Sequence, residues 1–172
     1  MSAVIQSAPI PQLMKAVVCH GPWDYRLEEV PTPRADTHEV VIKLQTCGVC
    51  ASDMKCYTGA PLFWGDAHRK PYVDGPVIAG HEFIGEVVQL GEGAGEKFGL
   101  APGDIAISEQ IVPCWNCRYC RMGKYWLCQV HNIYGFQRVV HGGMAEYMKF
   151  PARSLVYKVP KDIPPANAAM IE

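Results

Sequence analysis

The sequence lacks an excess of charge of either sign. Its 16 lysine and arginine residues are matched by 17 aspartate and glutamate residues, which gives a formal net charge of −1. A chain so close to neutral has no strong field that would attract nucleic acid or an anionic membrane. No apolar run approaches the roughly 18 residues of a membrane-spanning helix, and the N-terminus has neither the cationic start nor the apolar stretch of a secretory signal. We therefore expect a cytoplasmic protein with no nucleic-acid or membrane partner.

A glycine-rich dinucleotide-binding fingerprint is also absent. Gly91–Gly95 is the one glycine-rich stretch, and Glu96 breaks the G-x-G-x-x-G pattern there. We interpret this stretch as a surface turn. With 172 residues the chain is long enough to bury one core, as a single domain does. The sequence therefore predicts one domain that does not itself bind a dinucleotide.

Cysteine, in contrast, is plentiful, with eight residues, and four of them follow the spacing C-x2-C-x2-C-x7-C: Cys114, Cys117, Cys120 and Cys128. Four thiolates on one short loop can surround a zinc ion tetrahedrally and leave no open position, which indicates a structural zinc in a lobe of about residues 112–130. Disulfides fit poorly, because the cysteines cluster and no export signal is present. An iron–sulfur cluster is the alternative, but the bacterial ferredoxin run has a shorter last gap followed by proline, where this chain has Gln129.

A second group of metal-binding residue types lies upstream of the lobe. Cys47 and Cys50 form a C-x2-C pair, and His81 stands in a Gly-His-Glu segment. Each signal is weak alone, because such a pair can be redox-active and a single histidine is more often an interior residue than a ligand. In this order, ahead of the four-cysteine lobe, they resemble the zinc-containing medium-chain dehydrogenase/reductase family of alcohol and polyol dehydrogenases. The resemblance runs from about Met14 to the last residue.

This resemblance implies a catalytic zinc in addition to the structural zinc. Cys50 and His81 match the segments that supply the family's first two ligands, and Glu172, the last residue, matches the third. Such a ligand set leaves one position open for water or substrate and makes zinc a Lewis acid that lowers the pKa of an alcohol. An ordinary exposed glutamate remains the alternative interpretation of Glu172.

Three further residues gain roles from the same resemblance. Ser52 matches the hydroxyl that begins the family's proton relay, and Asp53 matches a carboxylate that orients His81. Glu82 is implied to lie near the zinc and to coordinate it at times. Ser52 and Asp53 also have structural interpretations, as a helix N-cap and as a first-turn acid stabilised by the helix dipole. Cys47 is expected to be a packed thiol outside the site.

The implied fold is mainly β: a GroES-like, partly open β-barrel with short helices and a zinc lobe over residues 14–172, preceded by a flexible tail at residues 1–13. Residue patterns agree with it. A helical turn is expected over Ser52–Tyr57, and the Pro164-Pro165 pair can open a helix over Asn167–Glu172. Two-residue alternation and apolar runs between turns predict strands at Lys15–His20, Val40–Gln45, Phe83–Leu90, Ile105–Ser108, Met144–Phe150 and Leu155–Val159.

The activity that the resemblance implies is oxidation of a secondary alcohol of a polyol or sugar alcohol to the ketone. Hydride would pass to NAD or NADP held by a Rossmann domain that these 172 residues do not contain. Segments on both sides of the ligand positions are most similar to bacterial dehydrogenases of small polyols. The loop Gly59–Asp74 carries residue types that stack on or hydrogen-bond to polyhydroxylated molecules, although an exposed aromatic loop is the plainer interpretation: Phe63, Trp64, His68 and Arg69.

Two other functions stay open. A zinc-stabilised scaffold without chemistry of its own is one, and a nucleic-acid-binding zinc module is the other. The near-neutral charge and the second metal constellation argue against the module. In the family the lobe meets partner surfaces, so we expect a homo-oligomer, a dimer or tetramer, at full length. The basic and aromatic residues that suggest the module are Arg118, Arg121 and Lys124 with Trp115, Tyr119, Tyr125 and Trp126.

Overall fold

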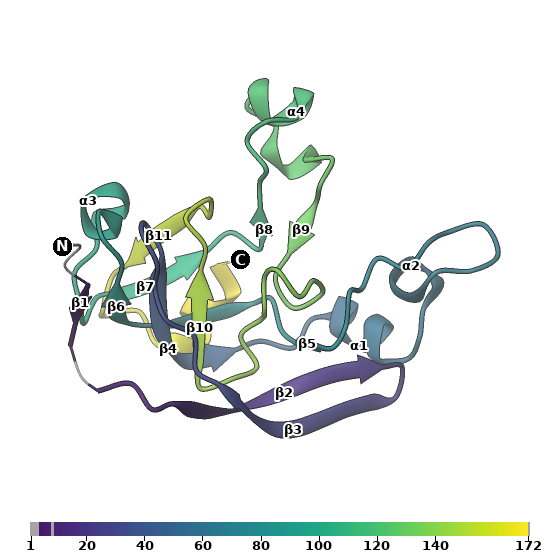
Figure 1. Ribbon diagram of the computed structural model, residues 1–172, viewed down its shortest axis with the longest axis horizontal. Coiled ribbons are helices and arrows are strands. Elements are labelled where there is room, and N and C mark those ends of the chain that lie inside the picture. Colours follow the sequence, from purple (N-terminus) through teal and green to yellow (C-terminus); the bar gives the residue numbers. More distant parts are fainter. Residues whose placement is uncertain (1–3, 8, 172) are drawn as a thin grey trace.

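A six-stranded antiparallel sheet forms the body of the computed structural model, which describes residues 4–7 and 9–171 (Figure 1). Its strands lie in the order β10-β4-β6-β7-β11, and β1 pairs with β6 beside this path. The register of β4 and β6 sets Cys47 opposite Phe83, so the chain just after β4 and the chain just before β6 lie together. The bounds are β1 Ile5–Gln6, β4 Val40–Cys47, β6 Phe83–Leu90, β7 Ile105–Ser108, β10 Tyr147–Phe150 and β11 Val156–Val159.

Two smaller sheets complete the strand structure. In one of them β2 pairs with both β3 and β5, and in the other β8 and β9 form a two-stranded ribbon. The lobe rises from this ribbon and projects away from the body (Figure 1). The ribbon therefore joins the two ends of the lobe. The bounds are β2 Leu13–Gly21, β3 Asp24–Pro31, β5 Val77–Ile78, β8 Ile111–Val112 and β9 Asn132–Ile133, with α4 Arg118–Arg121 and the 3-10 helix η1 Tyr125–Leu127 in the lobe.

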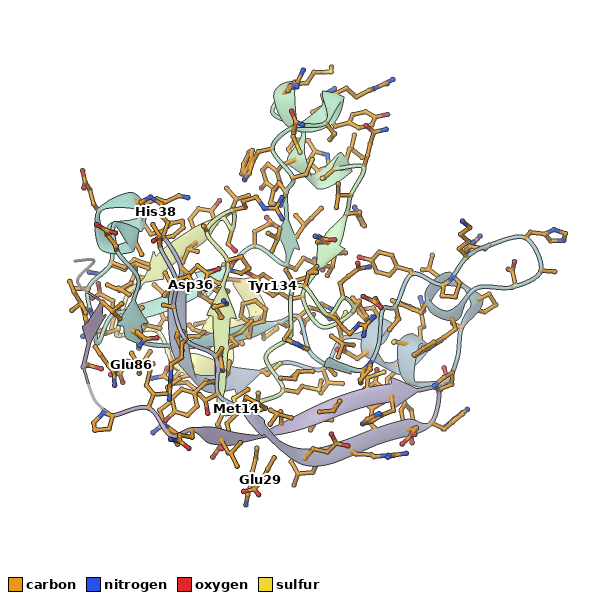
Figure 2. The ribbon with its side chains drawn as sticks, viewed as in Figure 1. Met14, Glu29, Asp36, His38, Glu86 and Tyr134 are labelled. Carbon is orange, nitrogen blue, oxygen red and sulfur yellow. The ribbon has the colours of Figure 1, made fainter. Side chains whose placement is uncertain are left out.

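The main core packs against the six-stranded sheet and includes Tyr134, which is fully buried (Figure 2). The ring of Tyr134 meets Phe83 edge to face at a centroid distance of 5.1 Å. Its hydroxyl forms a 2.7 Å hydrogen bond with the hydroxyl of Ser154, so the buried polar atom is satisfied. Burial of a large apolar side chain contributes roughly 1.5–3 kcal/mol. This core holds β6, and with it the segment that precedes β6, in a fixed position.

The mainly β character predicted from the sequence is confirmed, and the predicted strands are observed, β6 and β7 with the predicted bounds and the others with shifts at their ends. The structure adds β3, in which Arg26, Glu28 and Glu29 interrupt the apolar pattern. β3 is the outer strand of its sheet, where charged side chains can face solvent. Part of the tail predicted at residues 1–13 lies in strands, because Ile5–Gln6 forms β1 and Leu13 begins β2.

Short helices connect the strands. Gly93, with φ 73°, precedes α3, so the glycine-rich stretch is a turn that leads into a helix. The proline pair opens a helix as predicted. Within residues 4–7 and 9–171, no helix has the length and apolarity needed to cross a membrane. The bounds are α1 Ala51–Tyr57, α2 Pro61–Trp64, α3 Ala94–Phe98, α5 Pro165–Ala168 and the 3-10 helix η2 Ala169–Ile171.

Candidate metal centres and the cleft beside them

The four cysteines of the lobe lie together. Their sulfur atoms are all within 4.8 Å of one another. Backbone N–H groups of Asn116 and Cys117 donate to Cys114 Sγ at 3.4 and 3.3 Å, and the Cys114 N–H donates to Cys128 Sγ at 3.4 Å. Such donors stabilise thiolates, the form of cysteine that binds metal. The donor set therefore fits one tetrahedral zinc ion with no position left open.

Electrostatics differ between the sulfurs of this cluster. The backbone N–H groups of Cys120 and Gln129 lower the pKa of the Cys117 thiol to about 6. Burial raises the pKa of Cys120 to about 12, and its sulfur lies 3.9 Å from Cys114 Sγ. Several thiolates this close repel one another unless a cation lies between them. The arrangement is thus suited to a dication.

A second cluster forms where β4 ends and β6 begins. One atom each from Cys50, His81 and Glu82 lies within 4.8 Å of the others. Cys50 follows β4 and is the N-cap residue of α1, whereas His81 and Glu82 directly precede β6. The sequence predicted Cys50 and His81 as ligands and Glu82 as a neighbour that coordinates at times. Glu172, the predicted third ligand, lies outside the described residues.

Ser52 and Asp53, on the first turn of α1, both contact His81. The Ser52 hydroxyl lies 2.9 Å from His81 Nε2. Asp53 Oδ1 lies 3.3 Å from His81 Nδ1, an ion-pair distance without hydrogen-bond alignment, and Asp53 is 5% exposed. Asp53 Oδ2 accepts a 2.8 Å hydrogen bond from the Cys50 N–H. The N-cap residue is therefore Cys50, and the alternative interpretation of Ser52 as the N-cap is wrong.

These contacts prepare two groups for metal binding. A hydrogen bond with Ser52 lowers the pKa of the Cys50 thiol, and contact with His81 lowers it further. Burial lowers the pKa of His81, but the Asp53 carboxylate and Cys50 together outweigh burial and raise that pKa to about 9. A carboxylate partner of this kind increases the basicity of a ligating imidazole. The thiolate, imidazole and carboxylate donors together fit zinc.

Close backbone packing fixes His81. Gly80, with φ 92°, has no room for a side chain, because a Cβ atom there would lie 2.7 Å from Cys47 Sγ and 2.7 Å from Met144 Cγ. Only glycine adopts this conformation without strain. Cys47 itself stays outside the cluster, and burial raises its pKa to about 12. This placement of Cys47 agrees with the packed thiol that the sequence predicted.

A cleft of about 460 Å³ adjoins the second cluster and includes Ser52 in its wall. The ring of Phe136 packs between the cleft and the cluster, with its centroid 5.1 Å from that of His81. Sequence reasoning singled out Phe63 and Arg69 in this wall. It missed Gln110 and His131, which precede and follow the lobe and carry no spacing signal. The lining residues are Ser52, Leu62, Phe63, Arg69, Lys70, Pro71, Tyr72, Gln110, His131, Ile133 and Phe136.

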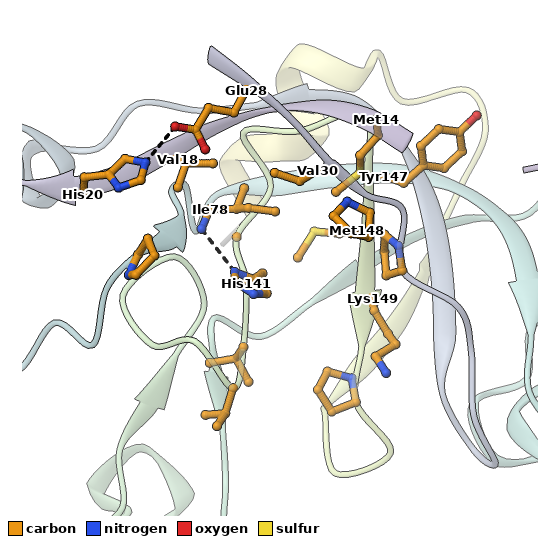
Figure 3. A pocket seen from close by; sticks show the side chains of 17 residues that line it. Met14, Val18, His20, Glu28, Val30, Ile78, His141, Tyr147, Met148 and Lys149 are labelled. Atoms are coloured by element: carbon orange, nitrogen blue, oxygen red, sulfur yellow. Dashed lines mark hydrogen bonds and ion pairs between the residues drawn. The ribbon is translucent and has the colours of Figure 1, made fainter. Parts of the chain in front are cut away.

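Another cavity, of about 430 Å³, lies between β2, β3 and β10 (Figure 3). Several of its polar groups have partners. His20 and Glu28 form an ion pair at 2.8 Å, and Lys149 Nζ lies 2.6 Å from Glu39. The Ile78 N–H donates to His141 Nδ1 at 3.1 Å. Ser52 and Phe136, which both contact His81, line the other cleft and not this cavity, so the cleft beside Ser52 is the better candidate for a substrate site.

We predict that His141→Gln makes the stability of the chain less sensitive to acid. Burial lowers the pKa of His141, so the unfolded chain takes up this proton first as pH falls below about 6.5, and folding stability is lost in that direction. Glutamine can accept the Ile78 N–H but does not titrate. The His141 ring lines an open cavity beside His20, Glu28 and Lys149. We therefore expect this proton uptake to change the free energy of unfolding by less than about 1 kcal/mol.

Urea unfolding of both chains at pH 7.5 and pH 5.5 measures this difference directly. The wild type should lose more unfolding free energy than the variant between the two pH values. Equal losses would show that His141 does not contribute to acid sensitivity.

Comparison with known proteins agrees with this arrangement. Residues 36–161 match the family described as the alcohol dehydrogenase GroES-like domain. The chain is 52% identical to the erythritol/L-threitol dehydrogenase of Mycolicibacterium smegmatis, over 96% of this chain and 46% of that protein. It therefore spans less than half the length of this curated relative.

Solved structures give the same result. The 2R,3R-butanediol dehydrogenase of Bacillus subtilis is 32% identical with a TM-score of 0.76, over 92% of this chain and 44% of that one. A zinc-binding dehydrogenase of Sinorhizobium meliloti bound to NADP is 26% identical with a TM-score of 0.79, over 94% and 43%. The predicted GroES-like fold is confirmed. Because the family match covers most of its length, the chain belongs to the alcohol dehydrogenase GroES-like domain family.

Proposed function

We propose that this chain is the catalytic domain of a zinc-dependent, NAD- or NADP-dependent polyol dehydrogenase, which oxidises a secondary alcohol to a ketone. The observation that carries the proposal is the three-donor cluster of Cys50, His81 and Glu82 beside a cleft, separate from a closed four-sulfur cluster in the lobe. A closed site suits a structural ion, whereas a site with an open position suits catalysis. Few proteins other than zinc dehydrogenases combine a closed zinc site with an open one.

The proposed ligands of the catalytic zinc are Cys50, His81 and Glu172, with Glu82 as a nearby carboxylate that coordinates at times in place of water. When bound, zinc supplies a Lewis acid that lowers the pKa of the substrate hydroxyl. Ser52, in the cleft wall, accepts the proton that the substrate loses and passes it outward. Asp53 holds His81 in its orientation through Nδ1. Phe136 and its apolar neighbours keep water away from the reacting carbon.

The coenzyme is proposed to bind a second domain outside these residues. This chain covers 46% of its erythritol/L-threitol dehydrogenase relative, and one structural neighbour is bound to NADP. The hydride acceptor would then meet the cleft at the boundary between the domains. A homo-oligomer, dimer or tetramer, is proposed for the longer enzyme.

The proposed substrate is a polyol, and a four-carbon polyol in the first instance. The 52% identity to a dehydrogenase of erythritol and L-threitol and the similarity to a butanediol dehydrogenase support this choice. They favour an enzyme over a scaffold or a nucleic-acid-binding module. In the lobe, Arg118 lies over the Tyr119 ring and Arg121 donates to Asn116, so these two cations have local partners.

Metal content per chain, measured by elemental mass spectrometry, tests the proposal. We expect two zinc ions in a version extended to the length of the relatives, and one zinc, held by the lobe, retained firmly by the 172-residue chain. The extended protein should reduce NAD or NADP with erythritol or threitol as the alcohol. One zinc in both proteins and no turnover would favour a scaffold. Iron in place of zinc would favour a cluster in the lobe.

A further inference from the structure

The loop from Gly65 to Pro71 forms one wall of the cleft and is folded back on its base. Asp66 and Arg69 exchange backbone hydrogen bonds at 2.9 and 3.4 Å, and the Tyr72 N–H donates to Phe63 O at 2.9 Å. Gly65 has φ 80°, and a Cβ atom there would lie 2.5 Å from Arg69 O. The tight turn at Gly65 therefore sets where Arg69 lies.

The base of this loop is anchored to the metal-site helix. The Trp64 indole N–H donates to Cys56 O, in α1, at 2.7 Å. Phe63 is 5% exposed and its ring centroid lies 5.0 Å from that of Phe136. The Tyr72 hydroxyl donates to His131 O at 2.6 Å, which ties the loop to the chain that leaves the lobe. Packed aromatic rings thus fix the base of the loop, and the exposed side chain of Arg69 lines the cleft from this loop.

The lining of the cleft is chemically divided. An apolar surface is provided by Phe63, Phe136, Leu62 and Ile133. Two of the polar lining residues, Arg69 and Lys70, carry only hydrogen-bond donors, and the others can both donate and accept: Ser52, Tyr72, Gln110 and His131. No carboxylate lines the cleft in the described part of the chain. Within residues 4–7 and 9–171, no ion pair or side-chain hydrogen bond joins Arg69 or Gln110 to another residue. The side chains of Arg69 and Gln110 therefore line the cleft without a hydrogen bond or ion pair to the described part of the chain.

We propose that Arg69 and Gln110 form a subsite for the hydroxyl groups of the polyol that are remote from the reacting carbon. The inference rests on the proposed function, because it places the reacting hydroxyl at the Cys50, His81 and Glu82 cluster. Guanidinium groups offer several donors in one plane, which suits two neighbouring hydroxyl oxygens, and the Gln110 amide can both donate and accept. Arg69 and Gln110 are specificity-determining residues in this arrangement. Simple alcohols leave the subsite unused.

The test compares a polyol with an alcohol of equal carbon number. Arg69→Ala and Gln110→Leu are made in the extended enzyme, and kcat/KM is measured for erythritol or threitol and for butan-2-ol. Loss of a hydrogen bond to a charged group reduces kcat/KM for the polyol by about 10- to 100-fold in Arg69→Ala, and loss of a neutral one by about 3- to 10-fold in Gln110→Leu. The value for butan-2-ol stays within about 2-fold in both.

Two control variants support the comparison. His68→Ala changes an exposed side chain on the same loop that does not line the cleft, and it should leave both substrates unaffected. Arg69→Lys keeps the charge but loses the planar set of donors, so it should recover only part of the polyol activity. Similar activity of Arg69→Lys and wild type would reduce the role of Arg69 to charge alone and contradict the hydroxyl subsite.

Other results overturn the inference in distinguishable ways. An equal fall for both alcohols would mean that Arg69 supports the chemistry or the fold instead of polyol recognition. A change confined to the KM of the coenzyme would assign Arg69 to that ligand. No change for either alcohol would remove both residues from the site. If the wild-type enzyme binds two zinc ions and oxidises butan-2-ol but no polyol, the dehydrogenase chemistry stands and the subsite does not. If it oxidises neither alcohol, the proposed function is overturned as well.

Discussion

Replacing Cys50 by serine is expected to abolish alcohol oxidation by the extended enzyme while one zinc ion per chain stays bound. Cys50 is the thiol in the three-donor cluster, and its pKa is lowered by contacts with Ser52 and His81. A serine hydroxyl does not ionise near neutral pH and is a poor zinc ligand. Loss of the Lewis acid removes several kcal/mol of transition-state stabilisation, which corresponds to about a 10³-fold or greater fall in kcat.

Cys47→Ser is the matched control for this experiment. Cys47 precedes Cys50 by three positions in the same C-x2-C pair, yet its sulfur lies outside the cluster and donates to Gly48 O at 3.6 Å. We expect this variant to keep two zinc ions and most of the activity. Full turnover by Cys50→Ser, or equal loss in both variants, would contradict the assignment of Cys50 as a ligand.

Cys117→Ser should act on stability instead of chemistry. It removes one of four sulfurs from a site that has no spare position. Even loss of a residue that only supports a metal ligand costs 10- to 100-fold in affinity, so loss of a ligand should cost about 3 kcal/mol or more of zinc-linked stability. For a domain of this size that corresponds to a fall in melting temperature of roughly 6–12 °C. Calorimetry of the 172-residue chain measures it.

Asn116→Ser tests whether this effect belongs to the metal. Asn116 is the exposed neighbour of Cys117, and its side chain accepts only a surface hydrogen bond from Arg121. Its melting temperature should stay close to that of the wild type. A chelator should lower the melting temperature of the wild type and of Asn116→Ser to that of Cys117→Ser, but leave Cys117→Ser little changed. A lost zinc ion with an unchanged melting curve would show that the lobe metal does not stabilise the fold.

Local patterns in the sequence predicted much of the fold. Strands β6 and β7 have the predicted bounds because their apolar runs end at clear turns. The outer strand β3 was not predicted, because its charged residues Arg26, Glu28 and Glu29 interrupt the apolar pattern. That pattern detects strands with a buried face and misses a strand whose side chains face solvent. Likewise, β1 is two residues long and exists through its pairing with Leu90 and Gln89, which no local pattern records.

The two metal clusters also differ in how far local sequence patterns could predict them. Regular spacing identified the lobe cluster, because all four cysteines lie within one short loop. The second cluster needed family resemblance, since Cys50 and His81 meet through the register of β4 and β6. Gln110 and His131 were missed, because they reach the cleft from opposite ends of the lobe. Contacts between distant segments depend on the packed fold, and a single sequence contains no direct signal for them.

The difference in sequence separation between the two clusters has a consequence for assembly. All four sulfurs of the lobe come from the single stretch Cys114–Cys128, so only a short loop must close before a metal ion can be captured. Cys50 and His81 come together only after β4 and β6 have paired. Closing the lobe cluster therefore requires no pairing of β4 with β6, and the lobe can bind an ion independently of that pairing. The second cluster depends on that pairing, so a change that disturbs the register of β4 and β6 would separate Cys50 from His81 and leave the four lobe sulfurs together in one loop.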